Sequence, residues 1–577
     1  MANRYVRAAR LDQLRQAGCL AVSLDGQAIL LVVQRERVYA LENRCPHMGF
    51  PLHRGTVQDG ILTCHWHHAR FDLATGGTFD PWAGDVRTYP VEIRGDEVWV
   101  DLTPPADALE RQRTRLHEGL ERNISLVIAK AAIAMLDGAG DPALAARLGL
   151  EFGVRYRREG WGPGLTILAC MVNLLPHLAP EDRAQALYHG LSAVANDTRN
   201  SSPRFPLRPL PGGPHDVDTL KRWFRRFIEV RDAEGAERCV VSAVHSGAER
   251  RQLADMLFAA ITDHRYVSTG HPLDFTNKAL EALDAVGWDL AEPVLASLVP
   301  GYADGDRMEE SNQWRHPVDL VAILDEAFAA LPAAISAGHA RRSTWQGARD
   351  LVPVLLGDDP RAIAEGLLEA LRNGATEVEL ASTVSYAAAL RIARFPTSNE
   401  FGDWDTALHT FTFANAVEQG LRRVPSPELL RGLFDAAMSV YLDRFLNVPA
   451  ARLPAVDEAP PDPQALLDEL AALLDRQQQV DEAGRLVARY VAGGGDPAKL
   501  IAALGRLLLR EDRNFHTIQM IEAAVRQVTW RGTTEEAIHI LIAAARYLAA
   551  HAPTVRAQSQ TFRIAQRLHR GERLYEE

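Results

Sequence analysis

Short apolar runs alternate with turn-forming residues over the N-terminal part of the chain. β-branched and aromatic runs of about four to eight residues, bounded by turn formers, are typical of strands. Such runs occupy residues 19–23, 29–34, 37–41, 70–73, 88–93 and 97–102. Gly95 and Asp96 lie between the last two runs and favour a hairpin turn. We therefore expect residues 1–104 to form an antiparallel β domain.

The pattern becomes helix-like after a segment with two prolines, TPPAD at 103–107, which we interpret as a linker. Apolar residues then recur at helical spacing at Leu116, Leu120, Ile124 and Val127. That spacing predicts one face of a single helix. Alanine, leucine, arginine and glutamate dominate almost to the C-terminus, and no β-rich region is visible after residue 104. The predicted fold class is multidomain α+β, with a β domain ahead of a large all-α domain.

Breaks in the helical pattern divide the all-α part. They fall at 200–216, 301–317, 395–403 and 453–463. The last break is acidic and rich in proline, which favours an exposed loop or linker. We therefore expect one helical part at 105–452 and a second at 453–577.

Glycine-terminated apolar runs recur along the helical part. Gly247, Gly374 and Gly494 each end such a run, and in each case a leucine follows after five intervening residues. A glycine that closes one helix before the next begins is typical of an αα-hairpin. The pattern predicts divergent helix-pair repeats.

Histidines open four further segments that resemble one another. The segments begin at His189, His271, His409 and His516, and we expect each histidine to start a helix. Their spacing is too uneven for a simple solenoid. We therefore expect the helix pairs to wrap around a central cavity.

Composition is that of an ordinary globular protein with more than one domain. The 577 residues exceed what a single core supports, and the chain is 47% hydrophobic and 24% charged. The formal net charge of −12 disfavours nucleic acid as a partner, because a phosphate-binding surface would be basic.

The N-terminus and the cysteines bear on location. The N-terminal stretch lacks the apolar core of a signal peptide. No run of about eighteen apolar residues is apparent, so we expect no membrane span. The five cysteines make no disulfide framework, which fits a reducing cytoplasm.

Two cysteine–histidine pairs are the main candidate site. Cys45 and His47 form a Cys-x-His pair, and Cys64 and His67 form a Cys-x-x-His pair. A [2Fe–2S] cluster with two thiolates on one iron and two imidazoles on the other needs this set. Zinc also accepts two cysteines and two histidines, so the spacing alone leaves a structural zinc knot open.

The residues around the two pairs resemble the Rieske ferredoxin and oxygenase families over residues 5–102. The matching positions are Pro46, Gly49, Pro51, Leu52, Gly55, Phe71, Asp72, Thr75 and Gly76. The resemblance implies a Rieske [2Fe–2S] cluster with Cys45 and Cys64 as thiolate ligands. It implies His47 and His67 as imidazole ligands near the surface. No spare cysteine flanks the pairs, as in the soluble type without a disulfide, and His68 stands where many relatives have glycine.

A second metal site is the open question in the helical part. Oxygenases of this kind add a mononuclear iron with a pattern near Asp-x2-His-x4-His, which we do not find. The histidines His189, His271, His409 and His516 would instead form an additional iron site if the repeats close on one axis. Asp405 and Asp512, each four residues before a repeat histidine, would balance the charge. The alternative is that a repeated histidine serves a repeated packing need.

Two classes of function follow from these features. The first is an oxidoreductase whose cluster passes single electrons to a small organic substrate or a second redox centre in the helical domain, in the manner of an oxygenase. It would need an external reductase or ferredoxin, because no flavin or nucleotide motif is visible. The second is an electron-transfer or redox-sensing scaffold without its own turnover.

Overall fold

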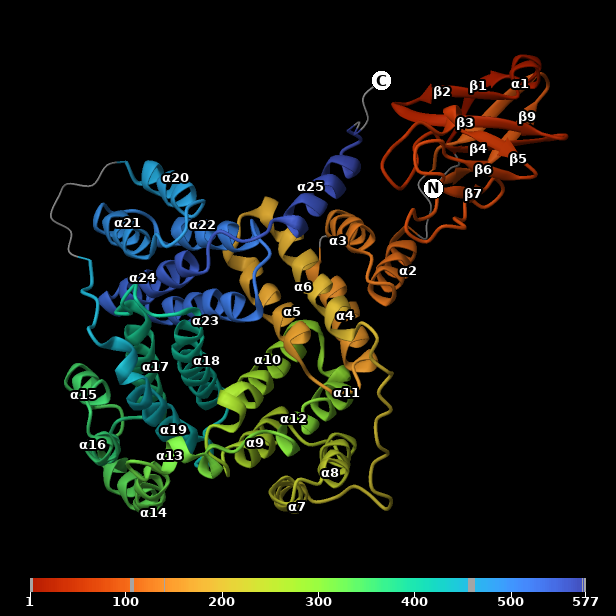
Figure 1. The fold of residues 1–577 in the computed structure, drawn as a ribbon. Coiled ribbons are helices and arrows are strands. Elements are labelled where there is room, and N and C mark those ends of the chain that lie inside the picture. The colour runs from red at the N-terminus through yellow and green to blue at the C-terminus, as the bar shows by residue number, and fades with distance from the viewer. Residues whose placement is uncertain (1–3, 104–107, 140, 455–461, 573, 575–577) are drawn as a thin grey trace. The chain divides into compact units, whose positions relative to one another are not determined.

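The computed structural model describes residues 4–103, 108–139, 141–454, 462–572 and 574. It forms two compact units, one of Met1–Leu148 with Gln558–Glu577 and the other of Gly149–Ala557 (Figure 1). The predicted linkers at 103–107 and 453–463 fall largely outside the described residues. Each unit is considered by itself below.

Three small antiparallel sheets build the N-terminal part of the first unit (Figure 1). Their strand orders are β1-β10-β9, β2-β3-β4-β8 and β5-β6-β7. The strands are β1 (Tyr5–Arg10), β2 (Cys19–Leu24), β3 (Gln27–Gln34), β4 (Arg37–Glu42), β5 (Thr56–Gln58), β6 (Ile61–Thr63), β7 (Arg70–Asp72), β8 (Thr88–Tyr89), β9 (Val91–Arg94) and β10 (Glu97–Asp101). The predicted antiparallel β fold is confirmed.

Local differences from the predicted strands have simple causes. The run at 88–93 divides at Pro90 into β8 and β9, because proline cannot donate to a ladder. Helix α1 (Leu11–Ala17) and strands β1, β5 and β6 were not predicted, since they are short and carry many polar residues. The predicted turn at Gly95 joins β9 to β10, and its φ of 62° suits glycine.

The predicted single helix through Leu116 and Val127 is wrong. The chain forms α2 (Ala108–Glu121) and α3 (Ser125–Ala139), which pack against each other. Asn123 adopts a φ of 52° between them and reverses the chain. Leu116, Leu120 and Val127 are nevertheless buried, so the apolar pattern identified core positions but not the break.

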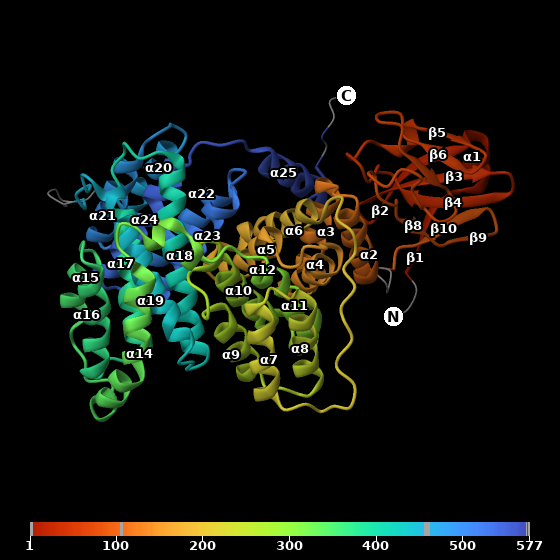
Figure 2. The same ribbon diagram turned by 60° about the horizontal axis from the view of Figure 1, so that its bottom comes forward.

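Among the described residues of the second unit, the regular secondary structure is helical and no strand occurs, which confirms the predicted all-α region (Figure 2). Helix α4 (Pro142–Tyr156) begins in the first unit and continues into the second, and α25 (Ala557–His569) lies almost entirely in the first unit. The remaining α-helices belong to the second unit. They are α5 (Pro163–Leu174), α6 (Arg183–Thr198), α7 (Val217–Glu229), α8 (Ala233–His245), α9 (Arg250–Ile261), α10 (His271–Val286), α11 (Ala291–Ala296), α12 (Val299–Ala303), α13 (Asn312–Arg315), α14 (Leu320–Gly338), α15 (Ala348–Leu355), α16 (Pro360–Arg372), α17 (Glu377–Ala393), α18 (Phe401–Arg423), α19 (Leu429–Leu442), α20 (Pro463–Leu473), α21 (Val480–Ala492), α22 (Pro497–Leu509), α23 (Phe515–Arg531) and α24 (Glu535–Ala550).

The glycine-terminated runs behave as local helix ends. Gly247, Gly374 and Gly494 follow α8, α16 and α21, and each has a positive φ. The next helix begins a few residues later in each case, as an αα-hairpin requires. Whether these pairs are true repeats stays a prediction.

The predicted breaks are borne out to different degrees. The segment at 200–216 is free of helix between α6 and α7. The segment at 301–317 instead contains the end of α12 and all of α13, because its short helices carry no long apolar period.

Helix α14 bears on the expectation that no segment spans a membrane. Leu320–Arg341 is the one described stretch with the length and apolar composition of a span, at a mean hydropathy of 1.7. Asp325 and Glu326 interrupt its apolar run, which is why the sequence pattern did not single it out. The core helix of a globular protein meets the same criterion.

Candidate metal centres

Two loops at one end of the β sheets carry the cysteine–histidine pairs. The first loop follows β4, and the Cys45 amide donates to the Phe50 carbonyl at 2.8 Å. The second loop joins β6 to β7, and the Cys64 amide donates to the Ala69 carbonyl at 2.8 Å. Both loops are therefore closed by their own backbone, which fixes the residues between.

The four side chains converge. Cys45 and Cys64 are buried, with exposed fractions of 3% and 1%. The rings of His47 and His67 lie 4.7 Å apart between centroids, nearly perpendicular, and His67 is exposed to solvent. The two cysteine side chains are therefore buried, whereas His67 reaches solvent and His47 is half-buried.

The electrostatics of the thiol pair favour an anionic site. A hydrogen bond between the two side chains raises the pKa of Cys45 and lowers the pKa of Cys64 to about 6. Backbone amides of His47 and Met48 also hydrogen bond to Cys45, and those of Trp66 and His67 to Cys64. Such amide bonds to sulfur help to set the potential of an iron–sulfur cluster.

The residues present fit a [2Fe–2S] cluster. The Nδ1 atom of His47 is buried and has no hydrogen-bond partner, as expected of a nitrogen reserved for a metal. Burial lowers the pKa of His47 to about 4, with a further contribution from His67, so its ring is neutral and able to ligate. Thiolates and neutral imidazoles are the donors such a cluster uses.

His68 shows why glycine suits its position in relatives. The residue has a φ of 62°, in the left-handed region that glycine enters without steric cost. Its side chain is exposed.

Lys130 contacts the first loop and was missed from the sequence. Its ammonium donates to the carbonyl of His47 at 2.8 Å and to the carbonyl of Pro46. The signal was present: it is the only charged or polar residue between Leu126 and Leu136. A lysine placed alone in an apolar helix calls for a partner.

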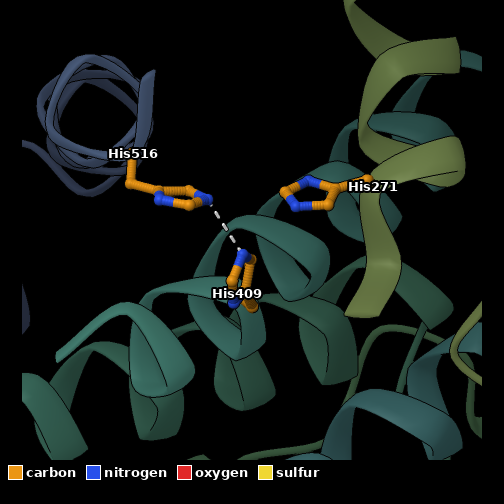
Figure 3. Close-up of side chains that lie close together, drawn as sticks. All are labelled: His271, His409 and His516. Carbon is orange, nitrogen blue, oxygen red and sulfur yellow. Dashed lines mark hydrogen bonds between the residues drawn. The ribbon is translucent and has the colours of Figure 1, made fainter. Parts of the chain in front are cut away.

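Three of the four predicted histidines meet in the second unit (Figure 3). His271 begins α10, His409 lies within α18, and His516 is the second residue of α23. Their ligand atoms all lie within 4.8 Å of one another, and the Nε2 atoms of His409 and His516 are 3.0 Å apart. Three imidazoles pointing at one place form a facial set of nitrogen donors.

Burial keeps two rings of this histidine cluster, those of His271 and His409, in the neutral form. Burial, and then the neighbouring histidines, lower the pKa of His271 to about 3. Burial and His516 likewise lower the pKa of His409 to about 4. Neutral imidazole is the form that binds a metal ion, so no proton has to be displaced at neutral pH.

Asp405 lies behind the cluster. Its Oδ2 atom is 3.4 Å from Nδ1 of His516, and its Oδ1 accepts from the Tyr547 hydroxyl at 2.5 Å. Burial raises the pKa of Asp405, but hydrogen bonds from His516, His551 and Tyr547 outweigh it and hold the pKa below the usual range. A carboxylate on the far nitrogen of an imidazole orients the ring toward a metal.

A strained turn places His271. Ser268 and Thr269 have φ values of 43° and 55°, in the left-handed region, and Gly270 follows at 89°. A Cβ on Gly270 would come within 3.0 Å of Phe413, so only glycine fits. Backbone strain of this kind is held by its surroundings and clusters at functional sites.

His189 does not join the other three, and its predicted role at the start of a helix is wrong. It lies in the middle of α6, is 4% exposed and contacts the ring of Tyr188. The prediction that His409 begins a helix is also wrong, because α18 starts at Phe401. Sequence similarity aligned the residues, but helix boundaries do not follow the alignment.

Comparison with known proteins identifies the class of the N-terminal part. The family model of the Rieske [2Fe-2S] domain matches residues 4–90, and this part of the chain belongs to that family. A Rieske domain implies a [2Fe–2S] cluster and electron-transfer chemistry. The helical remainder lies outside the match.

Individual relatives cover the same region. The ferredoxin component of the naphthalene 1,2-dioxygenase system of Pseudomonas aeruginosa is 29% identical over 104 residues, which is 18% of this chain and 100% of the relative. The 4beta-methylsterol monooxygenase of Methylococcus capsulatus is 35% identical over 80 residues, 12% of this chain and 21% of the relative.

The ferredoxin of carbazole 1,9a-dioxygenase from Nocardioides aromaticivorans is 33% identical, with a TM-score of 0.17, and the match covers 17% of this chain and 98% of that one.

Proposed function

We propose that the chain is a Rieske-type oxidoreductase with a second metal centre in its helical unit. Cys45 and Cys64 hold one iron of the cluster, and His47 and His67 hold the other. The cluster supplies one-electron transfer when it is bound. His271, His409 and His516 hold the metal that receives the electrons.

The observation that carries this proposal is the histidine cluster itself. Three imidazoles from three helices come together, with their ligand atoms within 4.8 Å of one another. A packing role alone would be served better by apolar side chains, since burying polar rings costs free energy unless they are bonded. Imidazole suits iron, zinc, copper and nickel, and a redox partner for the cluster favours iron.

Asp405 supports the same reading. It contributes a negative charge close to the three histidines and orients His516. Tyr547 and His551 hold Asp405 from the other side. These residues would complete the surroundings of a metal ion.

The partners follow from the proposed electron path. An external reductase or ferredoxin supplies electrons, because the chain shows no nucleotide motif. The relatives named above belong to oxygenase systems, which favours a small organic substrate oxidised in the helical unit. We propose a cytoplasmic location on the cysteine content.

The test is metal content on protein purified without oxygen. Wild-type protein is expected to hold the two irons of the cluster and one further metal ion per chain. His409→Ala should lose the further metal while the reduced Rieske EPR signal survives. The control is His245→Ala, an exposed histidine of α8 that pairs with Glu292, which should change neither.

The other outcomes are equally informative. Two irons with no further metal in wild-type protein would overturn the second centre and favour an electron-transfer or redox-sensing protein without turnover. That alternative is supported by the ferredoxin component of the naphthalene 1,2-dioxygenase system, because the match covers its whole length. Zinc in place of iron at the cysteine pair would overturn the whole proposal.

A further inference from the structure

Helix α3 contains one charged residue in an otherwise apolar stretch. Between Leu126 and Leu136 all residues except Lys130 are apolar. Placing an ammonium there costs desolvation free energy that only good polar contacts offset. The contacts it makes are therefore informative about its role.

Those contacts lie on the first cluster loop. Lys130 donates to the carbonyl oxygens of Pro46 and His47, the two residues that follow Cys45. Among the described residues no carboxylate pairs with its ammonium. Its charge therefore faces the loop that holds one cysteine and one histidine of the proposed ligands.

The residues around Lys130 carry more positive than negative charge. Lys130 lines a cavity of about 620 Å³ beside Cys45, together with Arg44, Arg87, Arg111 and Arg115. Three acidic residues, Glu42, Asp85 and Glu118, line the same cavity. Positive side chains thus outnumber negative ones on this side of the loop.

We propose that Lys130 is a positioning residue that fixes the first loop and raises the reduction potential of the cluster. This inference rests on the proposed cluster ligands. Reduction adds one electron to one iron and breaks no bond, so the cluster gains one negative charge. A cation that is close by and partly shielded from water attracts that charge more strongly than it would across bulk water. The Rieske family match ends at residue 90, so Lys130 lies outside the matched domain. A residue of the helical part of the chain thereby adjusts the reduction potential of the cluster.

The test is a redox titration of the full chain, in which the EPR signal of the reduced cluster is the readout. Lys130→Met removes charge and hydrogen bonds, and Lys130→Gln removes the charge but keeps a donor. Both should lower the midpoint potential, by roughly a tenfold change in the reduced-to-oxidised ratio, or about 59 mV for one electron.

The matched control is Arg113→Gln, which removes an exposed cation of α2 in the same unit. Its potential should equal that of wild-type protein, because water and salt screen an exposed charge. Lys130 variants that keep both the cluster and the wild-type potential would overturn the inference. If Lys130→Met does not fold, Lys130→Gln decides the matter. Wild-type protein without a Rieske signal would instead overturn the proposed function.

Discussion

Asp405 precedes His409 by four residues on α18, yet its carboxylate faces His516 on α23, with Oδ2 and Nδ1 3.4 Å apart. The sequence showed only that Asp405 lies four residues before His409, and predicted that its charge would balance a metal site. In the fold, Asp405 of α18 instead contacts His516 of α23. This contact connects α18 to α23 at the histidine cluster.

Replacing Asp405 tests this relationship. Asp405→Asn keeps the shape of the side chain and removes its charge, so the orientation and basicity of His516 are weakened. We expect metal affinity in the helical unit to fall by about 10–100-fold, the range for partners of metal-bound histidines. Competition with a chelator would measure it. Asp403→Asn, at the start of the same helix and away from the cluster, should have no effect, and equal affinities for all three proteins would remove Asp405 from the site.

Replacing Cys64 tests the cluster ligands. Cys64→Ser should abolish the Rieske EPR signal and the two irons, because a hydroxyl is a poor substitute for thiolate. Cys19→Ser is the matched control, since Cys19 is an exposed cysteine of β2 in the same domain. A cluster that survives Cys64→Ser unchanged would show that the ligand lies elsewhere.

A buried ion pair holds two helices of the histidine cluster together. The ammonium of Lys278 on α10 lies 2.6 Å from Glu522 on α23, and both side chains are almost fully buried. Lys278→Met leaves Glu522 with only the more distant Arg526, at 3.7 Å, and should destabilise the helical unit by about 3–5 kcal/mol. Chemical denaturation followed by circular dichroism would measure this loss.

The double variant Lys278→Met with Glu522→Leu is the comparison. It removes both charges, so it should recover much of the stability lost in the single variant. Lys221→Met, at a more exposed pair with Asp255, should cost far less. A single variant as stable as wild-type protein would show that the pair contributes little.

His189 should make the helical unit sensitive to acid. Burial lowers its pKa from 6.5 to about 4, so the ring is neutral when folded and binds a proton on unfolding below pH 6.5. Stability should therefore fall as pH drops from about 6.5 to 4, by about 2 kcal/mol at pH 5 for this residue. His189→Leu should flatten that part of the profile, measured by denaturation at several pH values. An unchanged slope would contradict the assignment.

The cluster loops were predictable from the sequence because their chemistry is local. Cys45 and His47 lie in one closed loop, as do Cys64 and His67, so spacing and flanking residues describe each half of the site. The antiparallel strands were predictable for the same reason, since alternation and turn residues act over a few positions. Lys130 was not found, because its partners lie more than eighty residues away in the chain.

The histidine cluster shows the limit of the sequence. Similar segments marked His189, His271, His409 and His516 as equivalent, but only tertiary packing decides which rings meet. A strained turn at 268–270 positions His271 at the cluster, whereas His189 is buried in the middle of α6. The sequence alone determined the class of each domain and the cluster motif. The tertiary structure decided the partners of the distant histidines and of Asp405, because such contacts depend on how helices pack and not on local spacing.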